Sequence, residues 1–307
     1  MTVAVYTAAR DYTDEMRRNN PKRRVSISGI LHCIGVSTSG YYAWIKHTPS
    51  DSETHRNQIK DKIQDIYQSS YQIYGAPKIT AIMRQQGNAI SERTTGKYMH
   101  EMGIRARWVK HWTRTTIHSD FDLQLKNILN EQFNPSDPNQ VWVSDITYIW
   151  TDDGFVYLTS IMDLFSRRIL AWTLSPTLEA KYVVDTIQKA IRERNGVRPR
   201  VFHNDRGCQY VSQEFLDATR GITNSYSKKG YPWDNACIES FHALIKREWL
   251  NRFKISNYEE AYRYVFEYIN TFYNTIRIHS HCGYLSPVQY EKKYLDHMTI
   301  TEQKLAG

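Results

Sequence analysis

The sequence predicts an α/β protein, with an all-helical N-terminal region followed by a domain in which helices flank a β-sheet. Two patterns predict it. Apolar residues recur at helical spacing between residues 25 and 102, whereas the segments 141–150, 155–164 and 167–175 are rich in β-branched and aromatic residues. The chain has 307 residues, of which 41% are hydrophobic and 13% aromatic. That is enough apolar material for the cores of two or three domains.

Residues 1–53 are predicted to form a basic arm and a short helical segment. The arm covers residues 1–24, is polar, and ends in the basic stretch MRRNNPKRR. The helical pair that follows at 25–47 has Ile30, Leu31, Tyr41 and Trp44 on its apolar face.

Residues 54–114 are predicted to form a helix-turn-helix-like DNA-binding domain. An amphipathic helix is followed by a helix that Pro77 opens, a turn that contains Gly87, and a helix that Ser91 caps. Arg93 and Lys97 lie on the polar face of that last helix and suit a DNA groove. The alternative is a helical bundle whose basic face is only solvated.

The end of this region, RARWVKHWTR, mixes basic and aromatic side chains. Basic groups neutralise phosphates and aromatic rings stack on bases, which suits nucleic-acid binding. The alternative is a linker whose tryptophans pack on the core. The candidate DNA contacts are Arg105, Arg107, Trp108, Lys110 and Arg114. Residues 115–138 are predicted to be a connector.

The sheet domain is predicted at 139–295, with a tail at 296–307. Its first three strands form an antiparallel meander, because Asp153-Gly154 supplies a hairpin turn between the first two. A helix at 179–195 follows, and the segment 198–205 then forms another strand.

Three acidic residues in this domain are candidates for a metal site. Asp145 interrupts the apolar face of the first strand, where a carboxylate is costly unless a metal ion or a buried cation pairs with it. Asp205 ends a strand, and Gly207 then allows a sharp turn; a capping role is the alternative for this Asp. Glu239 lies on a helix that Asp234 is expected to start. Carboxylates from separate elements can hold two divalent cations that act on a phosphodiester.

Several basic residues near these acids are candidate DNA contacts. Lys246 follows Glu239 on the same helical stripe and suits a phosphate, although a solvated lysine is the alternative. His242 is expected to be structural or to contact DNA rather than to bind metal. The remaining candidates in this domain are Lys228, Lys229 and Arg277.

Charge is distributed unevenly along the chain. The net charge is +8, and residues 1–120 hold 18 Lys and Arg against 10 Asp and Glu. Residues 121–307 hold 22 of each kind. The N-terminal part is therefore predicted to be the principal grip on nucleic acid.

The four cysteines contain no CxxC pair, which argues against a structural zinc site. Unpaired thiols suit a reducing compartment. The sequence shows no signal peptide and no apolar run long enough to span a membrane. We therefore expect a cytoplasmic protein.

The segments VWVSDITYI, HNDRGCQY, WDNACIESFHALIKREW and YNTIRIHSHCGYLSPVQYE resemble the retroviral-integrase-like catalytic core of bacterial insertion-sequence transposases. Together with GVSTSGYYAW, IYGAPKI and TTGKYMHEMGI nearer the N-terminus, the chain is similar to the OrfB proteins of the copy-out, paste-in family. The resemblance implies an RNase H-like core with a five-stranded mixed sheet. It also implies that Asp145, Asp205 and Glu239 are the DDE ligands of two Mg²⁺ ions, for which Mn²⁺ can substitute.

The same resemblance implies a DNA transposase that cleaves strands at insertion-sequence ends and transfers the freed 3′-OH to target DNA. Its partners would be the terminal inverted repeats, further copies of itself in a homodimer or higher multimer, and an OrfA protein or frameshift fusion. Two alternatives remain from the residues alone. One is an RNase H-like nuclease that cuts without joining, and the other is a non-catalytic DNA-binding regulator.

Overall fold

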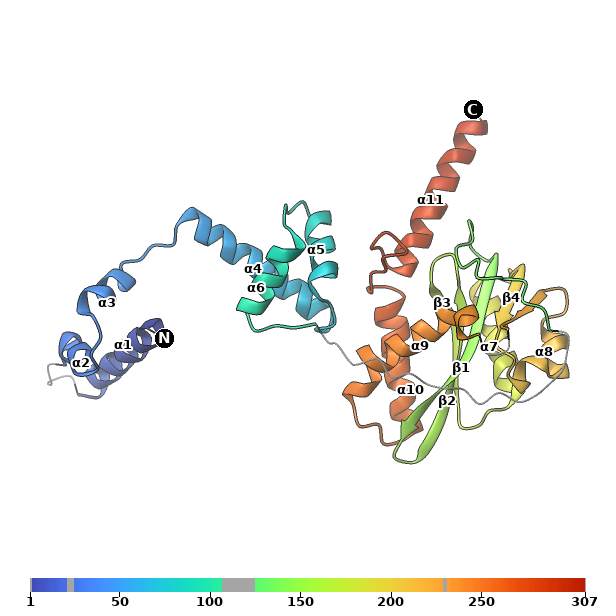
Figure 1. Ribbon diagram of the computed structural model, residues 1–307, viewed down its shortest axis with the longest axis horizontal. Coiled ribbons are helices and arrows are strands. Elements are labelled where there is room, and N and C mark those ends of the chain that lie inside the picture. Colours follow the sequence, from blue (N-terminus) through green and yellow to red (C-terminus); the bar gives the residue numbers. More distant parts are fainter. Residues whose placement is uncertain (1, 21–24, 107–124, 229–230, 307) are drawn as a thin grey trace. The chain divides into compact units, whose positions relative to one another are not determined.

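A computed structural model describes residues 2–20, 25–106, 125–228 and 231–306, and its helices and strands are labelled in Figure 1. The chain divides into two compact units, 1–61 and 62–307. Several predicted DNA contacts lie outside the described residues, namely Arg107, Trp108, Lys110, Arg114 and Lys229.

The first unit is helical. Its elements are α1 (Thr2–Asn19), α2 (Ile27–Cys33), α3 (Thr38–Ile45) and the first part of α4 (Asp51–Ser69). The prediction of an arm at 1–24 is wrong, because Tyr6 and Ala9 of α1 pack with Leu31 and Tyr41 in a small core. Of the described side chains in this helix of 18 residues, only Tyr6, Ala9 and Thr13 are buried, and a helix with so few buried residues has a polar composition that is easily mistaken for an arm.

The predicted helix-turn-helix is present. It consists of α4, α5 (Ala76–Gln85) and α6 (Glu92–Glu101). Gly87 takes a left-handed φ of +80° in the turn, and Ser91 Oγ accepts the Thr94 N–H at the start of α6. The buried hydroxyls of Thr80 and Thr95 hydrogen bond at 2.8 Å and join α5 to α6. The predicted boundary between residues 53 and 54 falls inside α4.

The described part of the second unit also contains a five-stranded mixed sheet, which confirms the predicted fold class. Its strands are β1 (Val141–Thr151), β2 (Gly154–Asp163), β3 (Arg168–Ser175), β4 (Val201–Asn204) and β5 (Thr223–Tyr226). The order is β3-β2-β1-β4-β5. The first three strands form the antiparallel meander, while β4 pairs in parallel with both β1 and β5.

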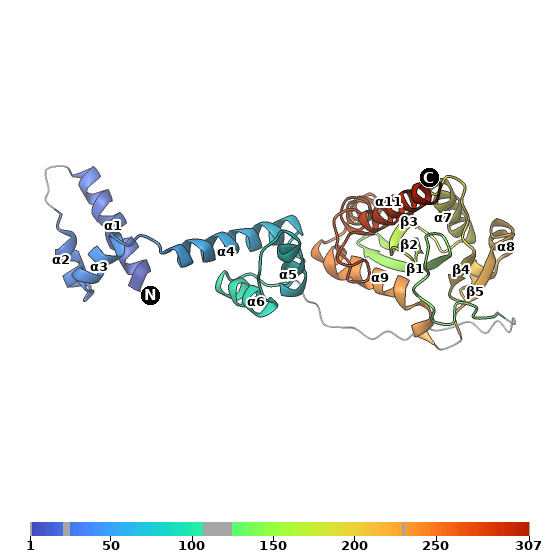
Figure 2. The same cartoon turned by 90° about the horizontal axis from the view of Figure 1, so that it is seen from above.

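Helices cover both faces of the sheet, as Figure 2 shows. Alternation along β1 sends Trp142 and Asp145 to opposite faces. Trp142 shares a core with Val183 and Ile187 of α7 (Ala180–Glu193). The Asp145 face is covered by α9 (Ala236–Glu248), which contacts both β1 and β2. The sheet therefore presents its acidic residue to α9 and not to α7.

Shorter helices complete the core. They are η1 (Cys208–Val211), α8 (Gln213–Ala218), η2 (Pro232–Asn235), η3 (Leu250–Arg252), α10 (Tyr258–Phe266) and the π-helix η4 (Glu267–Tyr273). The last helix, α11 (Pro287–Ala306), is continuous through the predicted boundary between residues 295 and 296, so the expected tail belongs to a helix. Among the described residues, no helix combines the length and apolarity needed to cross a membrane.

Candidate active site

Asp145 lies in the middle of β1, between strand neighbours that bury its face. Val143 and Ile149 on the same face are buried, whereas the Asp145 side chain is 17% exposed. Its Oδ1 accepts the N–H of Ile146 at 2.8 Å. The carboxylate therefore emerges from an apolar strand with one oxygen already fixed by the backbone.

Asp205 follows the last residue of β4, directly beside β1 in the sheet. Its Oδ1 accepts the N–H of Gly207 at 2.9 Å. Space is tight at this glycine, because a Cβ there would lie 3.0 Å from Asp205 Oδ1 and 3.1 Å from Gln209 Oε1 and would push these side chains aside. Its φ of −58° is ordinary, so the predicted need for glycine is explained by space and not by an unusual turn.

Glu239 lies in the first turn of α9. This helix begins at Ala236, after the η2 turn, and Asp234 does not cap it. Instead, Asp234 Oδ2 accepts the N–H of Lys228 at 2.6 Å and fastens the preceding loop. The prediction that Asp234 starts the helix is therefore wrong, although the helix itself is present.

The three carboxyl groups influence one another electrostatically. Burial, followed by the charge of Asp145, raises the pKa of Asp205 to about 7. Burial, followed by the charges of Asp145 and Asp205, raises the pKa of Glu239 to about 7. Like charges gathered in this way oppose ionisation, and a cation placed among them would relieve the repulsion.

The donors of this site suit a hard divalent cation. All three groups offer carboxylate oxygens, which Mg²⁺ and Mn²⁺ prefer to sulfur ligands. In the described residues, however, no three His, Cys, Asp or Glu side chains are close enough together to form a coordination sphere as they stand. Asp145, Asp205 and Glu239 are thus close enough to influence one another's ionisation, but they do not form a complete set of metal ligands in this conformation.

Two of the candidate DNA contacts are buried, and for His242 this agrees with the structural role that was one of its two expected roles. His242 is 5% exposed, with Nδ1 3.3 Å from Asp145 Oδ2 and Nε2 3.3 Å from Ser160 Oγ. Arg277 is 6% exposed and forms a two-pronged ion pair with Glu248 at 2.7 and 2.8 Å. Neither side chain is available to DNA in this conformation.

The other described candidates differ in exposure. Lys246 is half-buried, with Nζ 2.7 Å from Thr147 Oγ1 and 4.3 Å from the ring centre of Tyr148. Its ammonium group thus lies against the strand that carries Asp145. The four exposed candidates are Arg93, Lys97, Arg105 and Lys228.

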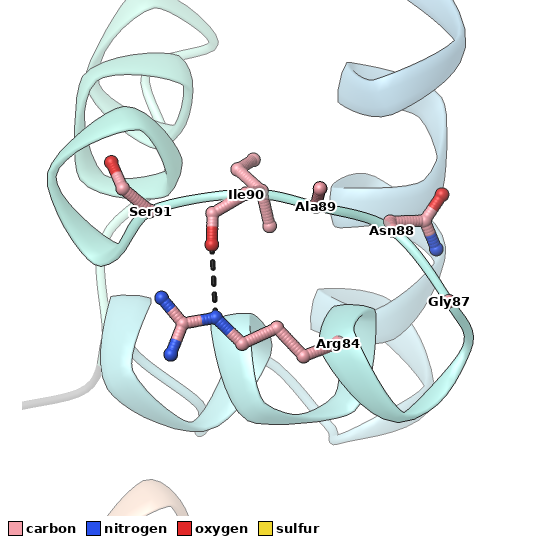
Figure 3. A pocket seen from close by; sticks show the side chains of 6 residues that line it. All are labelled: Arg84, Gly87, Asn88, Ala89, Ile90 and Ser91. Atoms are coloured by element: carbon pink, nitrogen blue, oxygen red, sulfur yellow. Dashed lines mark hydrogen bonds between the residues drawn. The ribbon is translucent and has the colours of Figure 1, made fainter.

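The helix-turn-helix turn contains an open cavity of about 590 Å³ (Figure 3). It lies between the end of α5 and the start of α6 and is lined by Arg84, Gly87, Asn88, Ala89, Ile90 and Ser91. Arg84 Nε donates to the carbonyl of Ile90 at 3.0 Å, so the guanidinium lies across the turn. Arg84 is exposed and lies just before the Gly87 turn, and it is not among the DNA contacts predicted from the sequence.

Comparisons with protein families match most of the chain. Models of the integrase core domain match residues 135–232 and 220–287. A model of an HTH-like domain matches residues 54–112.

Curated relatives cover most of the chain. The chain is 35% identical over 246 residues to the transposase for insertion sequence element IS904 of Lactococcus lactis, a match that spans 80% of this chain and 97% of that protein. It is 34% identical over 274 residues to transposase InsF for insertion sequence IS3A of Escherichia coli, spanning 88% and 95%. Among solved structures, the HTLV-2 integrase catalytic core domain in complex with magnesium is 17% identical, covers 50% of this chain and 97% of its own, and gives a TM-score of 0.40.

Proposed function

Since the chain belongs to the IS3 family of insertion-sequence transposases, we propose that it cuts DNA strands at the ends of an insertion sequence and joins the freed 3′-OH to a target strand. The observation that carries this proposal is the gathering of Asp145, Asp205 and Glu239 from β1, the end of β4 and α9. Burial, followed by the charges of the neighbouring carboxylates, raises the pKa values of Asp205 and Glu239.

Asp145, Asp205 and Glu239 are the proposed ligands of two Mg²⁺ ions, for which Mn²⁺ would substitute. Bound divalent cations would supply Lewis-acid activation of the attacking water or 3′-OH and stabilisation of the leaving oxygen. The chain itself supplies a fixed frame. The Ile146 N–H holds one oxygen of Asp145, and the Gly207 N–H holds one oxygen of Asp205. Glu239 is carried by α9, the helix that contacts β1 and β2.

Basic side chains are proposed to hold the DNA. Lys246, beside Thr147 on the strand of Asp145, would neutralise a phosphate near the reacting bond. The exposed Arg93 and Lys97 of α6 would follow a DNA groove, and Arg84 would meet a phosphate at the turn. The remaining proposed contacts are Arg105, Arg107, Trp108, Lys110, Arg114, Lys228 and Lys229.

The proposed reaction also indicates how many copies of the protein act together on DNA. Joining two ends of one element requires two catalytic centres on paired ends, so we expect a homodimer or higher multimer on the terminal inverted repeats. An OrfA protein, either separate or fused to this chain by frameshifting, is the further partner we propose.

Strand cleavage and joining on labelled DNA that carries the element's own ends, in the presence of Mg²⁺, tests the proposal. Glu239→Gln keeps the shape of the side chain and removes its charge, so cleaved and joined products should disappear while DNA binding persists. Glu214→Gln, an exposed residue of α8, removes the same charge elsewhere and should retain activity.

Each other outcome has a distinct meaning. Equal activity of wild type and Glu239→Gln would remove Glu239 from the site. Cleavage without joining, on DNA that lacks the element's ends, would indicate the nuclease. Binding without chemistry in the presence of OrfA would indicate the regulator.

A further inference from the structure

His242 is a buried histidine on the side of α9 that faces the sheet. It lies one turn after Glu239 in α9, and its ring packs on the face of the sheet against side chains of β1 and β2. Nδ1 lies 3.3 Å from Asp145 Oδ2, and Nε2 lies 3.3 Å from Ser160 Oγ. Both ring nitrogens therefore have protein partners.

The two partners of the ring are themselves neighbours. Asp145 in β1 and Ser160 in β2 face each other directly in the antiparallel register. Ser160 is fully buried, so its hydroxyl has no access to water. The His242 ring thus bridges a carboxylate and a hydroxyl that the sheet already holds side by side.

The Asp145 carboxylate determines which atom donates at one end of the ring. An ionised carboxylate only accepts hydrogen bonds, so Nδ1 carries the proton that faces Asp145. At the other end, the Ser160 hydroxyl can donate to Nε2 or accept from it, so it holds the ring in either case.

The consequence for Asp145 is that both of its oxygens have donors. The Ile146 N–H binds Oδ1 at 2.8 Å, and His242 faces Oδ2. The carboxylate plane is thereby fixed, and its unused lone pairs are left for a ligand. The same contacts argue against His242 as a metal ligand, because neither ring nitrogen is available, and its burial argues against a DNA contact.

We propose that His242, held by Ser160, is a positioning residue that orients Asp145 for cation binding. This inference rests on the proposed function of Asp145 as a metal ligand. Hydrogen-bond partners of metal ligands fix the ligand's orientation, and their loss commonly lowers metal affinity by about 10-fold to 100-fold.

Direct Mn²⁺ binding to the full chain without DNA, followed by electron paramagnetic resonance, tests this inference. His242→Phe fills the ring space without a donor and should lower Mn²⁺ affinity by about 10-fold or more. His242→Asn places an N–H near the position of Nδ1 and should recover much of the affinity. Ser160→Ala should shift affinity in the same direction as His242→Phe but by less, and it tests the same hydrogen-bonded bridge if His242→Phe does not fold.

Metal dependence of strand joining gives a second readout. The Mg²⁺ concentration for half-maximal rate should rise in His242→Phe, while the rate at saturating Mg²⁺ should recover towards wild type. A purely structural defect would lower the saturated rate and leave the half-maximal concentration unchanged. His55→Phe, which removes an exposed histidine of α4, should change neither quantity.

The variant Asp145→Asn distinguishes a failure of the proposed metal site from a failure of the proposed positioning role of His242. If Asp145→Asn loses Mn²⁺ binding but folded His242→Phe and Ser160→Ala bind as tightly as wild type, the positioning role is wrong and the metal site stands. If Asp145→Asn binds Mn²⁺ as wild type does, the metal site itself is wrong.

Discussion

At the scale of single residues, the candidate site depends on small distances around Asp205. Gly207 leaves room for that carboxylate, since a Cβ would come within 3.0 Å of its Oδ1. We predict that Gly207→Ala displaces the carboxylate and lowers metal-dependent joining by about 10-fold to 100-fold. The reason is that reaction rates fall steeply when a group in the active site is moved from its productive position. The backbone φ is ordinary at this position, so the thermal midpoint should change little.

The measurement is the joining rate beside the thermal midpoint of the same preparation. Gly29→Ala is the matched control, because its new Cβ would lie 3.7 Å from Ser26 Cβ, an ordinary contact. Full activity of Gly207→Ala would show that Asp205 tolerates displacement and would weaken its assignment as a ligand.

Arg277 illustrates the opposite case, a charged residue that stabilises rather than binds. Its guanidinium forms two hydrogen bonds to Glu248, which also accepts the hydroxyl of buried Tyr268 at 2.6 Å. We predict that Arg277→Ala lowers the free energy of unfolding by about 3–5 kcal/mol, because it leaves a buried carboxylate without its partner. Arg277→Lys should recover little, since an ammonium cannot replace the two-pronged geometry.

Urea unfolding of both Arg277 variants checks this prediction, with DNA affinity measured on the folded fraction. Unchanged stability combined with a loss of DNA affinity would restore the sequence-based interpretation of Arg277 as a DNA contact.

At the scale of elements, a buried ion cluster joins the end of α7 to β2 and α11. Arg194 pairs with Asp163 at 3.0 Å and with Glu291, and Arg168 also reaches Glu291. Burial raises the pKa of Asp163 to about 6 even though Arg194 opposes the shift. Burial also acts to raise the pKa of Glu291, but the hydrogen bond to Arg194 and the nearby positive charges outweigh it, so the pKa of Glu291 is lowered.

We predict that Arg194→Met destabilises the fold most at high pH. Without Arg194 the pKa of each buried carboxyl rises, so the folded state binds more protons than the unfolded state above about pH 4. The free energy of unfolding then falls as pH rises. The deficit against wild type should be small at pH 5 and about 3–5 kcal/mol at pH 8.

Urea unfolding at the two pH values measures this deficit. Arg192→Met, an exposed residue of the same helix, removes the same charge and should stay within about 0.5 kcal/mol of wild type. A deficit of Arg194→Met that is equal at both pH values would mean that packing, and not charge, explains it.

The elements also show what the sequence could and could not predict. Strands β1 to β3 and the α5–α6 turn follow local patterns, and the sequence segments around Asp145, Asp205 and Glu239 are what make these residues the candidate site. The roles of His242 and Arg277 depend on partners 97 and 29 residues away, at Asp145 and Glu248. A basic side chain without a visible partner is naturally interpreted as a DNA contact, and only the fold supplies the partner.

At the scale of the whole molecule, the distribution of charge separates two tasks. Residues 1–120 carry 18 Lys and Arg against 10 Asp and Glu, whereas residues 121–307 carry 22 of each. DNA affinity should therefore depend on the N-terminal part and fall steeply with salt, because each neutralised phosphate releases counterions. Chemistry should depend on the balanced part, where the acidic site resides.

We predict that the double variant Arg93→Ala, Lys97→Ala weakens DNA binding and reduces the slope of log affinity against log salt by about 2, close to one for each lost phosphate contact. Fluorescence anisotropy on DNA with the element's ends, measured across a salt series, gives the slope. An equal loss on unrelated DNA assigns both residues to phosphates, whereas a larger loss on the element's ends means that one of them reads a base.

The matched control removes two charges from the sheet domain. Lys181 and Arg192 are exposed on α7, the helix that covers the sheet face away from Asp145. If the double variant Lys181→Ala, Arg192→Ala lowers the slope as much as the α6 double variant does, that result would mean that net charge alone governs affinity and that the helix-turn-helix is not the principal DNA-binding element. A slope that changes only with the α6 pair would assign DNA capture to the N-terminal helices and leave the α9 face of the sheet to the reaction.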